Sequence, residues 1–280
     1  MLIKDRILED SVFSLVKNLG IEVFIDVGSN RPRNADRFFS LFGSVDERVT
    51  YYGFEANPFC FAYWIDSYSK PNIIFCNLAI SEYSGIQKFG MPNRNSTRPV
   101  SHLRKGLDLI DHFLFRNYHK ELQRFHIAND LGGSLVRNEE SPLKFYAPSL
   151  RLDEVFETFQ RPTILWIDVE GVVEQVLRSA GVLLEEKNLK VVYLEFDTTK
   201  ISAEDRHYIR VNSLLESFGF VCISISELGN GLYLRKECVG VFKAISVAAT
   251  TINSQKRKTK FLRVKSLVTS IERDLKSFTD

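Results

Sequence analysis

The chain alternates between short apolar runs and longer amphipathic stretches. The short runs are rich in β-branched and aromatic residues, which predicts buried strands, and the longer stretches repeat apolar residues at helical spacing. The predicted strands cover 22–27, 49–55, 73–77, 87–91, 163–168, 191–195, 220–224 and 232–244. The predicted helices cover 5–18, 35–42, a stretch that starts after Asn57-Pro58, 152–159, 170–179 with Gly181 as its stop, and 203–218.

This regular alternation of strand and helix predicts an α/β fold, with a mostly parallel sheet and helices on both of its faces. The end of the pattern differs. Only the turn Ser-Glu-Leu-Gly-Asn-Gly separates the last two predicted strands. Two strands joined so closely form a hairpin, so we expect the last strand to run antiparallel.

Three regions follow from the same pattern. Residues 1–20 are expected to form an N-terminal helix, 21–250 the main domain and 251–280 a C-terminal helix. Within the domain, the segment 92–148 contains a polar loop, a predicted helix over 107–128 and a Gly132-Gly133 break. It is too long for a plain connection, so we interpret it as an inserted segment that faces substrate or acts as a lid.

Charge separates the C-terminal region from the rest of the chain. The net charge of +2 combines a segment 255–280 at +5, with eight Lys and Arg against three acids, and a remainder at −3, with 29 against 32. Helical spacing of its apolar residues makes 251–280 a basic amphipathic helix, expected to contact the domain, a partner protein or an anionic surface. The slightly acidic remainder argues against a nucleic-acid partner.

Composition restricts both the class of protein and its expected location in the cell. A hydrophobic fraction of 44% is enough for a sizeable core. No apolar run approaches the ~20 residues of a transmembrane helix, and no signal-peptide pattern opens the sequence. The four cysteines are scattered without metal-binding spacing, which favours free thiols and a cytoplasmic location.

Candidate chemistry gathers where the predicted strands end. Asp26 and Gly28 lie at the end of the strand predicted over 22–27. Glu55 ends the strand over 49–55, and Asp168 ends the strand over 163–168. In open α/β sheets ligands bind outside the carboxyl ends of the strands, so these carboxylates are expected to line one crevice. Gly28 allows a close approach between backbone and ligand. An acid ahead of the glycine favours a ligand with positive charge or hydrogen-bond donors.

Two of these strand ends suit a nucleoside. Glu55 is placed to accept hydrogen bonds from two ribose hydroxyls, and Asn77 to meet an adenine amino group. The chain lacks the G-x-G-x-x-G turn after its first strand, which argues strongly against a nicotinamide-dependent oxidoreductase.

Five segments in order carry a resemblance to a known family. They are FIDVGSN at 24–30, GFEANP at 53–58, NLAIS at 77–81, SLRLDEV at 149–155 and ILWIDVEGVVEQVLRSA at 164–180. Together they resemble the FkbM-like branch of the class I S-adenosylmethionine-dependent methyltransferases, over about residues 20–245. The resemblance implies a Rossmann-like, seven-stranded, mostly parallel sheet with an antiparallel last strand. It also implies S-adenosylmethionine as cofactor and S-adenosylhomocysteine as product.

The resemblance further implies residue roles. The loop after the first strand would frame the methionine end of the cofactor, through Asp26, Gly28, Ser29 and Asn30. Glu55 would hold the ribose, and the 77–81 segment would flank the adenine, through Asn77, Ala79 and Ser81. Asp168 would face both cofactor and acceptor, with Glu170 as a second catalytic candidate.

The expected reaction is O-methylation of a hydroxyl on a sugar, a glycan or another secondary metabolite. The enzyme must align that hydroxyl with the methyl group, and Asp168 is our candidate for the base that removes its proton. A divalent metal held by Asp168, Glu195 and Asp197 is an alternative, since oxygen ligands suit Mg²⁺. His102 and His207 are expected to be solvated or packed.

The sequence departs from the family pattern at two places. The family carries another glycine soon after the first motif, where this chain has Arg31-Pro32-Arg33. This altered loop leaves a second function class open, a non-catalytic scaffold or binding protein with an S-adenosylmethionine fold. Trp166 stands where a lysine is common, and it either removes a charge from the site or simply packs. A nucleic-acid methyltransferase is a further alternative, permitted by the basic tail but disfavoured by the acidic remainder.

Overall fold

The computed structural model describes residues 5–29, 33–42, 48–67, 72–90, 144–158, 160–169, 171–196, 206–226 and 229–242. The chain divides into two compact units, Met1–Lys236 and Glu237–Asp280. Every strand and α-helix bounded below lies in the first unit. Of the second unit only 237–242 are described, so the predicted helix at 251–280 lies outside the described residues.

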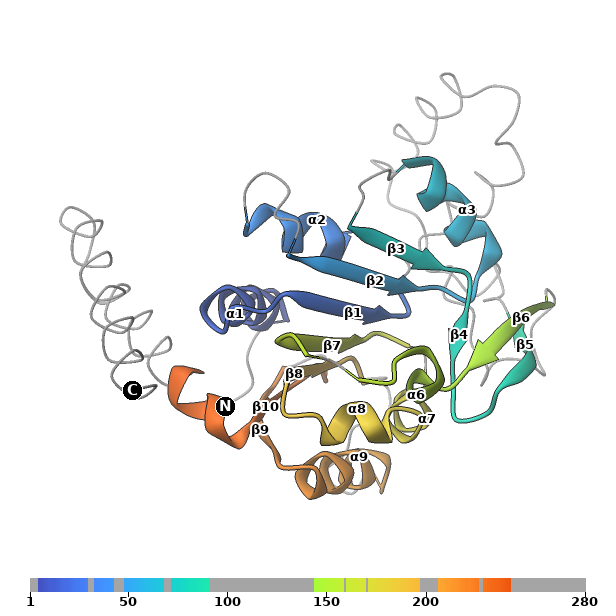
Figure 1. Ribbon diagram of the computed structural model, residues 1–280. Helices are drawn as coiled ribbons and strands as arrows, with labels where there is room; N and C mark the ends of the chain where they lie inside the picture. The colour runs from blue at the N-terminus through green and yellow to red at the C-terminus, as the bar shows by residue number, and fades with distance from the viewer. Residues whose placement is uncertain are drawn as a thin grey trace, which may run out of the picture. The chain divides into compact units, whose positions relative to one another are not determined.

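The first unit is built on a seven-stranded sheet in the order β3-β2-β1-β7-β8-β10-β9 (Figure 1). The strands are β1 Val23–Val27, β2 Thr50–Phe54, β3 Ile73–Cys76, β7 Thr163–Ile167, β8 Leu189–Leu194, β9 Phe220–Ile225 and β10 Gly231–Arg235. β10 pairs antiparallel with both β8 and β9, and the other pairings are parallel. The predicted α/β class and the reversed last strand are confirmed.

Helices cover both faces of this sheet. They are α1 Asp5–Asn18, α2 Arg33–Ser40, α3 Pro58–Ser67, α6 Leu152–Val155, α7 Val173–Arg178, α8 Gly181–Glu185 and α9 Arg206–Ser217. On one face, the ring of Phe24 in β1 stacks on Phe13 of α1 and contacts Phe38 of α2. None of the described helices is long and apolar enough to cross a membrane.

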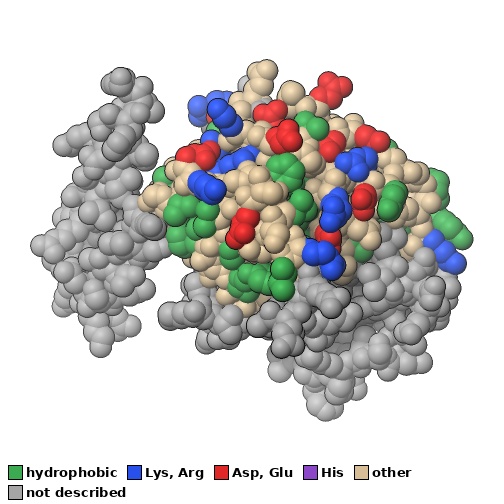
Figure 2. Space-filling view, turned by 90° about the horizontal axis from the view of Figure 1, so that it is seen from below, with side chains coloured by type: hydrophobic (Ala, Val, Ile, Leu, Met, Phe, Trp, Pro, Cys, Tyr) green, Lys and Arg blue, Asp and Glu red, His purple; other side chains and the backbone are tan. Residues whose placement is uncertain are grey.

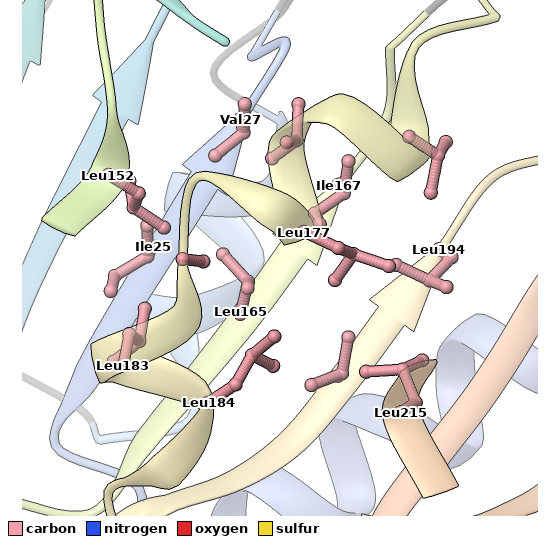
Figure 3. Packing of buried hydrophobic residues seen from close by; sticks show 14 of the residues in the cluster. Ile25, Val27, Leu152, Leu165, Ile167, Leu177, Leu183, Leu184, Leu194 and Leu215 are labelled. Atoms are coloured by element: carbon pink, nitrogen blue, oxygen red, sulfur yellow. The ribbon is translucent and has the colours of Figure 1, made fainter. Parts of the chain in front are cut away.

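The opposite face holds the larger aliphatic core. Side chains alternate along β1, so Ile25 points away from Phe24 and joins a buried cluster with Leu177 of α7, Leu183 of α8 and Leu215 of α9 (Figure 3). Burying each such side chain contributes roughly 1.5–3 kcal/mol. This packing covers β1 and β7 near the centre of the sheet, and the carboxyl ends of β1, β2 and β7 form the site described below.

The surface on the α8 and α9 side mixes charge types. Figure 2 shows Lys, Arg, Asp and Glu side chains interspersed with hydrophobic ones on this side. Val182 of α8 and Ile209 of α9 are among the exposed hydrophobic residues, at 47% and 49% exposure. Both signs of charge are present in the described part, in keeping with the nearly balanced composition of the chain outside its tail.

A second, three-stranded sheet has the order β4-β6-β5, with β4 Ala79–Ile80, β5 Gly85–Gly90 and β6 Lys144–Leu150. One of its faces is buried, where Phe89 and Ala147 pack with Ala79 and against Ala56. Residues from Lys144 onward pair with β5 as β6, so the end of the segment 92–148 that we interpret as an insert is part of this sheet. The rest of that segment, including the predicted helix at 107–128, lies outside the described residues.

Two predicted boundaries are also wrong. Gly181 does not stop the preceding helix but begins α8, because Asp153 Oδ1 accepts the backbone N–H groups of Val182 at 3.0 Å and Leu183 at 3.5 Å. The last strand ends at Arg235 rather than 244 and is followed by a 3₁₀ turn, Lys236–Cys238. Arg235 pairs with Phe220, the first residue of β9, so no partner strand remains beyond it.

Candidate functional site

The site begins with Asp26, near the carboxyl end of β1. Its side chain is fully buried, at 0% exposure. Oδ2 accepts hydrogen bonds from the Tyr51 hydroxyl and, at 3.2 Å, from Asn34 Nδ2. Oδ1 has no hydrogen-bond partner in the described part of the chain. A buried carboxylate oxygen without a donor is unfavourable, so Asp26 has acceptor capacity for a ligand.

Gly28 joins the ends of three strands. Its φ is +85°, and a Cβ on it would lie 1.9 Å from the backbone oxygen of Asp168. The Gly28 N–H donates to Phe54 O at 3.0 Å, and the Asp168 N–H donates to Val27 O at 2.9 Å. The loops that follow β1, β2 and β7 are therefore bonded together at the carboxyl edge, in a space that admits only glycine at this position.

Glu55 follows β2 directly and is 7% exposed. Its Oε1 accepts the backbone N–H of Asn57 at 2.7 Å. Asn77, after β3, donates from Nδ2 to the backbone oxygens of Glu55 at 2.8 Å and Ala56 at 3.2 Å. The Asn77 side chain thus fixes the backbone that carries Glu55, and its donor group is committed to that task.

Burial dominates the electrostatics of both carboxyl groups. It raises the pKa of Asp26 to about 6, against the hydrogen bonds from Tyr51 and Asn34 that lower it. Burial also raises the pKa of Glu55 to about 7; the charge of Asp26 adds to this rise and the Asn57 N–H opposes it. No described lysine or arginine forms an ion pair with either group. Two neighbouring buried carboxyl groups therefore depend on hydrogen-bond donors for their ionised form.

The predicted adenine-flanking residues Ala79 and Ser81 lie in and just after β4. Ala79 is 7% exposed and packs in the small apolar cluster of that sheet. Ser81 is 1% exposed, and its Oγ accepts a hydrogen bond from Gln87 Nε2 at 3.1 Å. Both residues thus belong to a segment held in the second sheet directly after Asn77, and their role toward a ligand stays a prediction.

The two acids that follow β7 and β8 lie at neighbouring strand ends. Asp168 and Glu195 are exposed, and the Glu195 N–H donates to Ile167 O at 2.9 Å. Asp168 is therefore beside Gly28 and open to solvent. Several predicted residues lie outside the described part of the chain: Asn30, Arg31, Pro32, His102, Glu170 and Asp197, together with the side chains of Arg33 and His207. Within the described residues, no group of three or more His, Cys, Asp or Glu could hold a metal ion.

Trp166 is part of the aromatic layer under α1. It is 3% exposed and stacks on Tyr193 with ring centroids 3.8 Å apart. It is also the register partner of Asp26 on the neighbouring strand. Of the two interpretations that the sequence left open for Trp166, the structure shows packing beside Asp26.

Glu174, the last acid of the IDVEGVVEQVL segment, lies in α7 and serves the fold. It accepts hydrogen bonds from Arg178 at 2.9 Å and from Arg210 of α9 at 2.8 Å. Partial burial acts to raise its pKa, but the two arginines prevail and hold that pKa below its usual range. The IDVEGVVEQVL segment therefore contains both an exposed acid of the site, Asp168, and an acid that stabilises the fold, Glu174.

Sequence reasoning missed three groups that shape the site: the Tyr51 hydroxyl, the Asn34 amide and the backbone N–H of Asn57. Tyr51 also pairs with Ser29 Oγ at 3.1 Å. Its contact with Asp26 depends on the β1–β2 register, which places Tyr51 opposite Phe24. The one signal in the sequence for this contact is strand alternation, which puts Tyr51 on the same face of the sheet as Asp26.

A doubly wound α/β sheet with buried carboxyl groups at the ends of its central strands defines the class of protein, a ligand-binding enzyme fold of the Rossmann-like type. The chain matches the model of the Methyltransferase FkbM domain over residues 26–222. This match covers well over half of the sequence, and the protein belongs to the FkbM methyltransferase family. No curated protein and no solved structure matches the chain.

Proposed function

We propose that the protein transfers the methyl group of S-adenosylmethionine to a hydroxyl oxygen of a sugar, a glycan or another secondary metabolite. The observation that carries the cofactor part of this proposal is the pair of buried carboxyl groups at the ends of β1 and β2, and the hydroxyl acceptor follows from the family resemblance. Asp26 and Glu55 have no cation paired with them among the described residues and need a ligand rich in donors. A nucleoside with a cationic amino acid end supplies such donors.

The described residues fit that cofactor. Asn57 holds one oxygen of Glu55 at 2.7 Å, which orients the carboxylate for the two hydroxyls of a ribose. The unpartnered Oδ1 of Asp26 suits the ammonium group at the methionine end, framed by Gly28, Ser29 and, in the proposal, Asn30. The close backbone approach at Gly28 fixes this loop against the Asp168 backbone, next to the proposed base.

Asn77 is the proposed adenine residue. Since its Nδ2 donates to the backbone of Glu55 and Ala56, the remaining side-chain oxygen is the group able to accept from the adenine amino group. Ala79 and Ser81 would flank the ring from the adjoining strand. In this arrangement the Asn77 amide both holds the backbone of Glu55 and accepts a hydrogen bond from the adenine amino group.

Bound S-adenosylmethionine would supply a methyl group already activated on a sulfonium. The protein's own task is then to align the acceptor hydroxyl and remove its proton. Asp168 is the proposed base, because it is exposed at the edge next to Gly28, and Glu170 is its proposed companion. Asp168→Asn should lower turnover at least tenfold and keep the affinity for S-adenosylhomocysteine; lost affinity would instead mean that Asp168 holds the cofactor.

Calorimetric titration with S-adenosylhomocysteine tests the cofactor assignment. Glu55→Gln keeps the size of the side chain and an acceptor for Asn57 but removes the charge. We expect it to weaken binding roughly 10- to 100-fold, the effect of hydrogen bonds to a charged group. The matched control is Glu185→Gln, an exposed glutamate at the end of α8, which should bind as the wild type does. Equal affinity in all three proteins would contradict the assignment.

The scaffold alternative rests on the sequence Arg31-Pro32-Arg33 after the first motif, where the family carries a second glycine. A labelled methyl donor, incubated with hydroxyl acceptors that include free sugars and glycans, separates the two functions. Methyl transfer to any of them establishes the enzyme, whereas tight cofactor binding without transfer across the panel favours the scaffold.

The proposal places the reaction in the cytoplasm, which the four free cysteines support. The acceptor would then be a small molecule or glycan available there. The basic 251–280 segment would contact a partner protein or an anionic surface rather than the acceptor.

A further inference from the structure

Arg151 links two parts of the first unit that border the proposed site. It lies between β6 and α6, and Figure 1 shows β6 leading into α6 beside α7. We propose that Arg151 is a positioning residue that sets the adenine-side segment 77–81 against the loop that carries Asp168. The inference rests on the proposed function, because it assigns a role in holding the same cofactor.

The first set of contacts reaches the second sheet. Arg151 Nη1 donates to Glu82 O at 3.1 Å, in the turn that follows β4. The Arg151 N–H donates to Glu154 Oε2 at 3.1 Å, and that same oxygen accepts the Ser84 hydroxyl. The turn at 82–84 is thus bonded to Arg151 through both its side chain and its backbone.

The second set of contacts reaches the end of α7. Arg151 Nη2 donates to Arg178 O, the last residue of α7, at 3.0 Å. The next residues strengthen this junction, since Leu152 N donates to Ser179 Oγ at 3.3 Å and Asp153 N to Ser179 O at 2.9 Å. One guanidinium therefore spans the distance between the second sheet and α7.

The two segments bonded to Arg151, the 82–84 turn and the end of α7, are each continuous in sequence with residues of the proposed site. The 82–84 turn continues backward through β4 to Asn77, whose amide holds the backbone of Glu55. α7 continues backward through Gly171 to Asp168, whose N–H is fixed to Val27 O. A shift between the turn and α7 would therefore change the spacing between the adenine residue and the proposed base.

The chemistry of this link suits arginine. Its planar fork directs two donors to two separate carbonyl groups, which a single ammonium group cannot match. Asp153 Oδ2 lies 3.3 Å from Nη2 and orients the fork. The Arg151 side chain is 33% exposed, so its ion pair adds little to stability and its effect should fall mainly on placement.

The test compares two arginines of similar structural role. Arg161 donates to Arg48 O at 2.5 Å and to Thr50 Oγ1 at 3.2 Å, at the start of β2 and therefore at the edge opposite the site. Affinity for S-adenosylhomocysteine and the unfolding temperature are measured for the full-length wild type, Arg151→Gln and Arg161→Gln. Wild-type binding is established first, since its absence would refute the proposed function rather than this inference.

We expect both variants to lose similar stability, and only Arg151→Gln to lose affinity, by roughly 5- to 30-fold for two charge-assisted hydrogen bonds. Wild-type affinity in Arg151→Gln overturns the inference. Equal losses of affinity in the two variants also overturn it, because affinity would then follow stability alone. If Arg151→Gln does not fold, Arg151→Lys and Arg161→Lys replace the pair: weaker binding in the first supports the inference, and equal binding overturns it.

Discussion

Gly28 combines two constraints at a single residue, a left-handed backbone and a space closed by the Asp168 carbonyl. Gly28→Ala should therefore lower the free energy of unfolding by about 3 kcal/mol or more and abolish cofactor binding. Gly219→Ala is the matched control, because Gly219 has a φ of +82° but its added Cβ would meet nothing closer than Arg235 Nη1 at 3.7 Å. That control should lose only about 1–2 kcal/mol. Equal losses in urea unfolding would show that the contact with Asp168 is unimportant.

The raised pKa values of Asp26 and Glu55 predict how stability depends on pH. A carboxyl group whose pKa is higher in the folded chain stabilises the fold while protonated, and this contribution disappears as pH rises through the folded pKa. For Glu55 the pKa rises from its ordinary 4.5 to about 7. The free energy of unfolding of the ligand-free protein should thus fall by about 3 kcal/mol between about pH 4.5 and pH 8.

Urea unfolding across this pH range measures the effect, with Glu55→Gln as the variant that should flatten the curve. A wild-type curve that rises over the same range, or a variant curve with the wild-type slope, would contradict the burial of this group. Cofactor binding should show the opposite trend and strengthen as Glu55 ionises, because the charged carboxylate is the better acceptor for ribose hydroxyls.

At this scale, the sequence was sufficient to place Glu55 and Gly28 at strand ends. The sequence could not show that the Asn77 amide supports the backbone of Glu55, nor that Tyr51 holds Asp26. Those contacts join residues that only sheet register brings together, and hydrogen-bond direction at an amide depends on its neighbours in space.

Among the elements, the carboxyl ends of α8 and α9 and the start of β8 are bonded to one buried arginine. Arg235 of β10 is 7% exposed and donates to Leu189 O at 3.1 Å and Glu186 O at 2.7 Å, as well as to the carbonyls of Leu184 and Phe218. Its guanidinium also lies 4.4 Å from the centre of the Phe220 ring. The helix C-terminal carbonyls, which lack partners within their helices, are thus satisfied by one side chain.

Arg235→Met should lower the free energy of unfolding by about 3–5 kcal/mol, because it leaves several buried carbonyl groups without a donor. The comparison is Arg210→Met in α9, whose side chain is 52% exposed and bonds Glu174. That change should cost less than about 1 kcal/mol. Similar thermal shifts in the two variants would show that the carbonyl cluster contributes no more than a surface ion pair.

Periodicity predicted most of these elements, including α1 over Asp5–Asn18 and the start of α3 at Pro58. It failed where tertiary contacts decide the boundary. Asp153 caps α8 from another part of the chain, and β6 exists because β5 is available to pair with it. Short strands and helix starts of this kind leave little periodic signal of their own.

On the scale of the whole molecule, every residue assigned to the site belongs to the unit Met1–Lys236, and the family match ends at residue 222. Deleting 251–280 should therefore leave the affinity for S-adenosylhomocysteine unchanged in calorimetric titration. Anionic vesicles provide the complementary readout, since the deletion should remove any binding that the basic segment provides. Lost cofactor affinity would place that segment in the site.

The mostly parallel sheet and its antiparallel last strand were predictable, because strand and helix alternate along the chain and the terminal turn is short. The five ordered motifs made the family recognisable. The acceptor was not predictable, since none of these motifs lies between residues 82 and 148 and the family name fixes no substrate. The same limit applies to 251–280, where composition indicates charge but no partner.

A crystal structure of the protein with S-adenosylhomocysteine would test the cofactor site. We expect both ribose hydroxyls within hydrogen-bond distance of Glu55, the adenine amino group at the Asn77 side-chain oxygen and the amino acid end beside Asp26 and Gly28. A nucleoside bound elsewhere, or one whose ribose does not meet Glu55, would refute the proposed site.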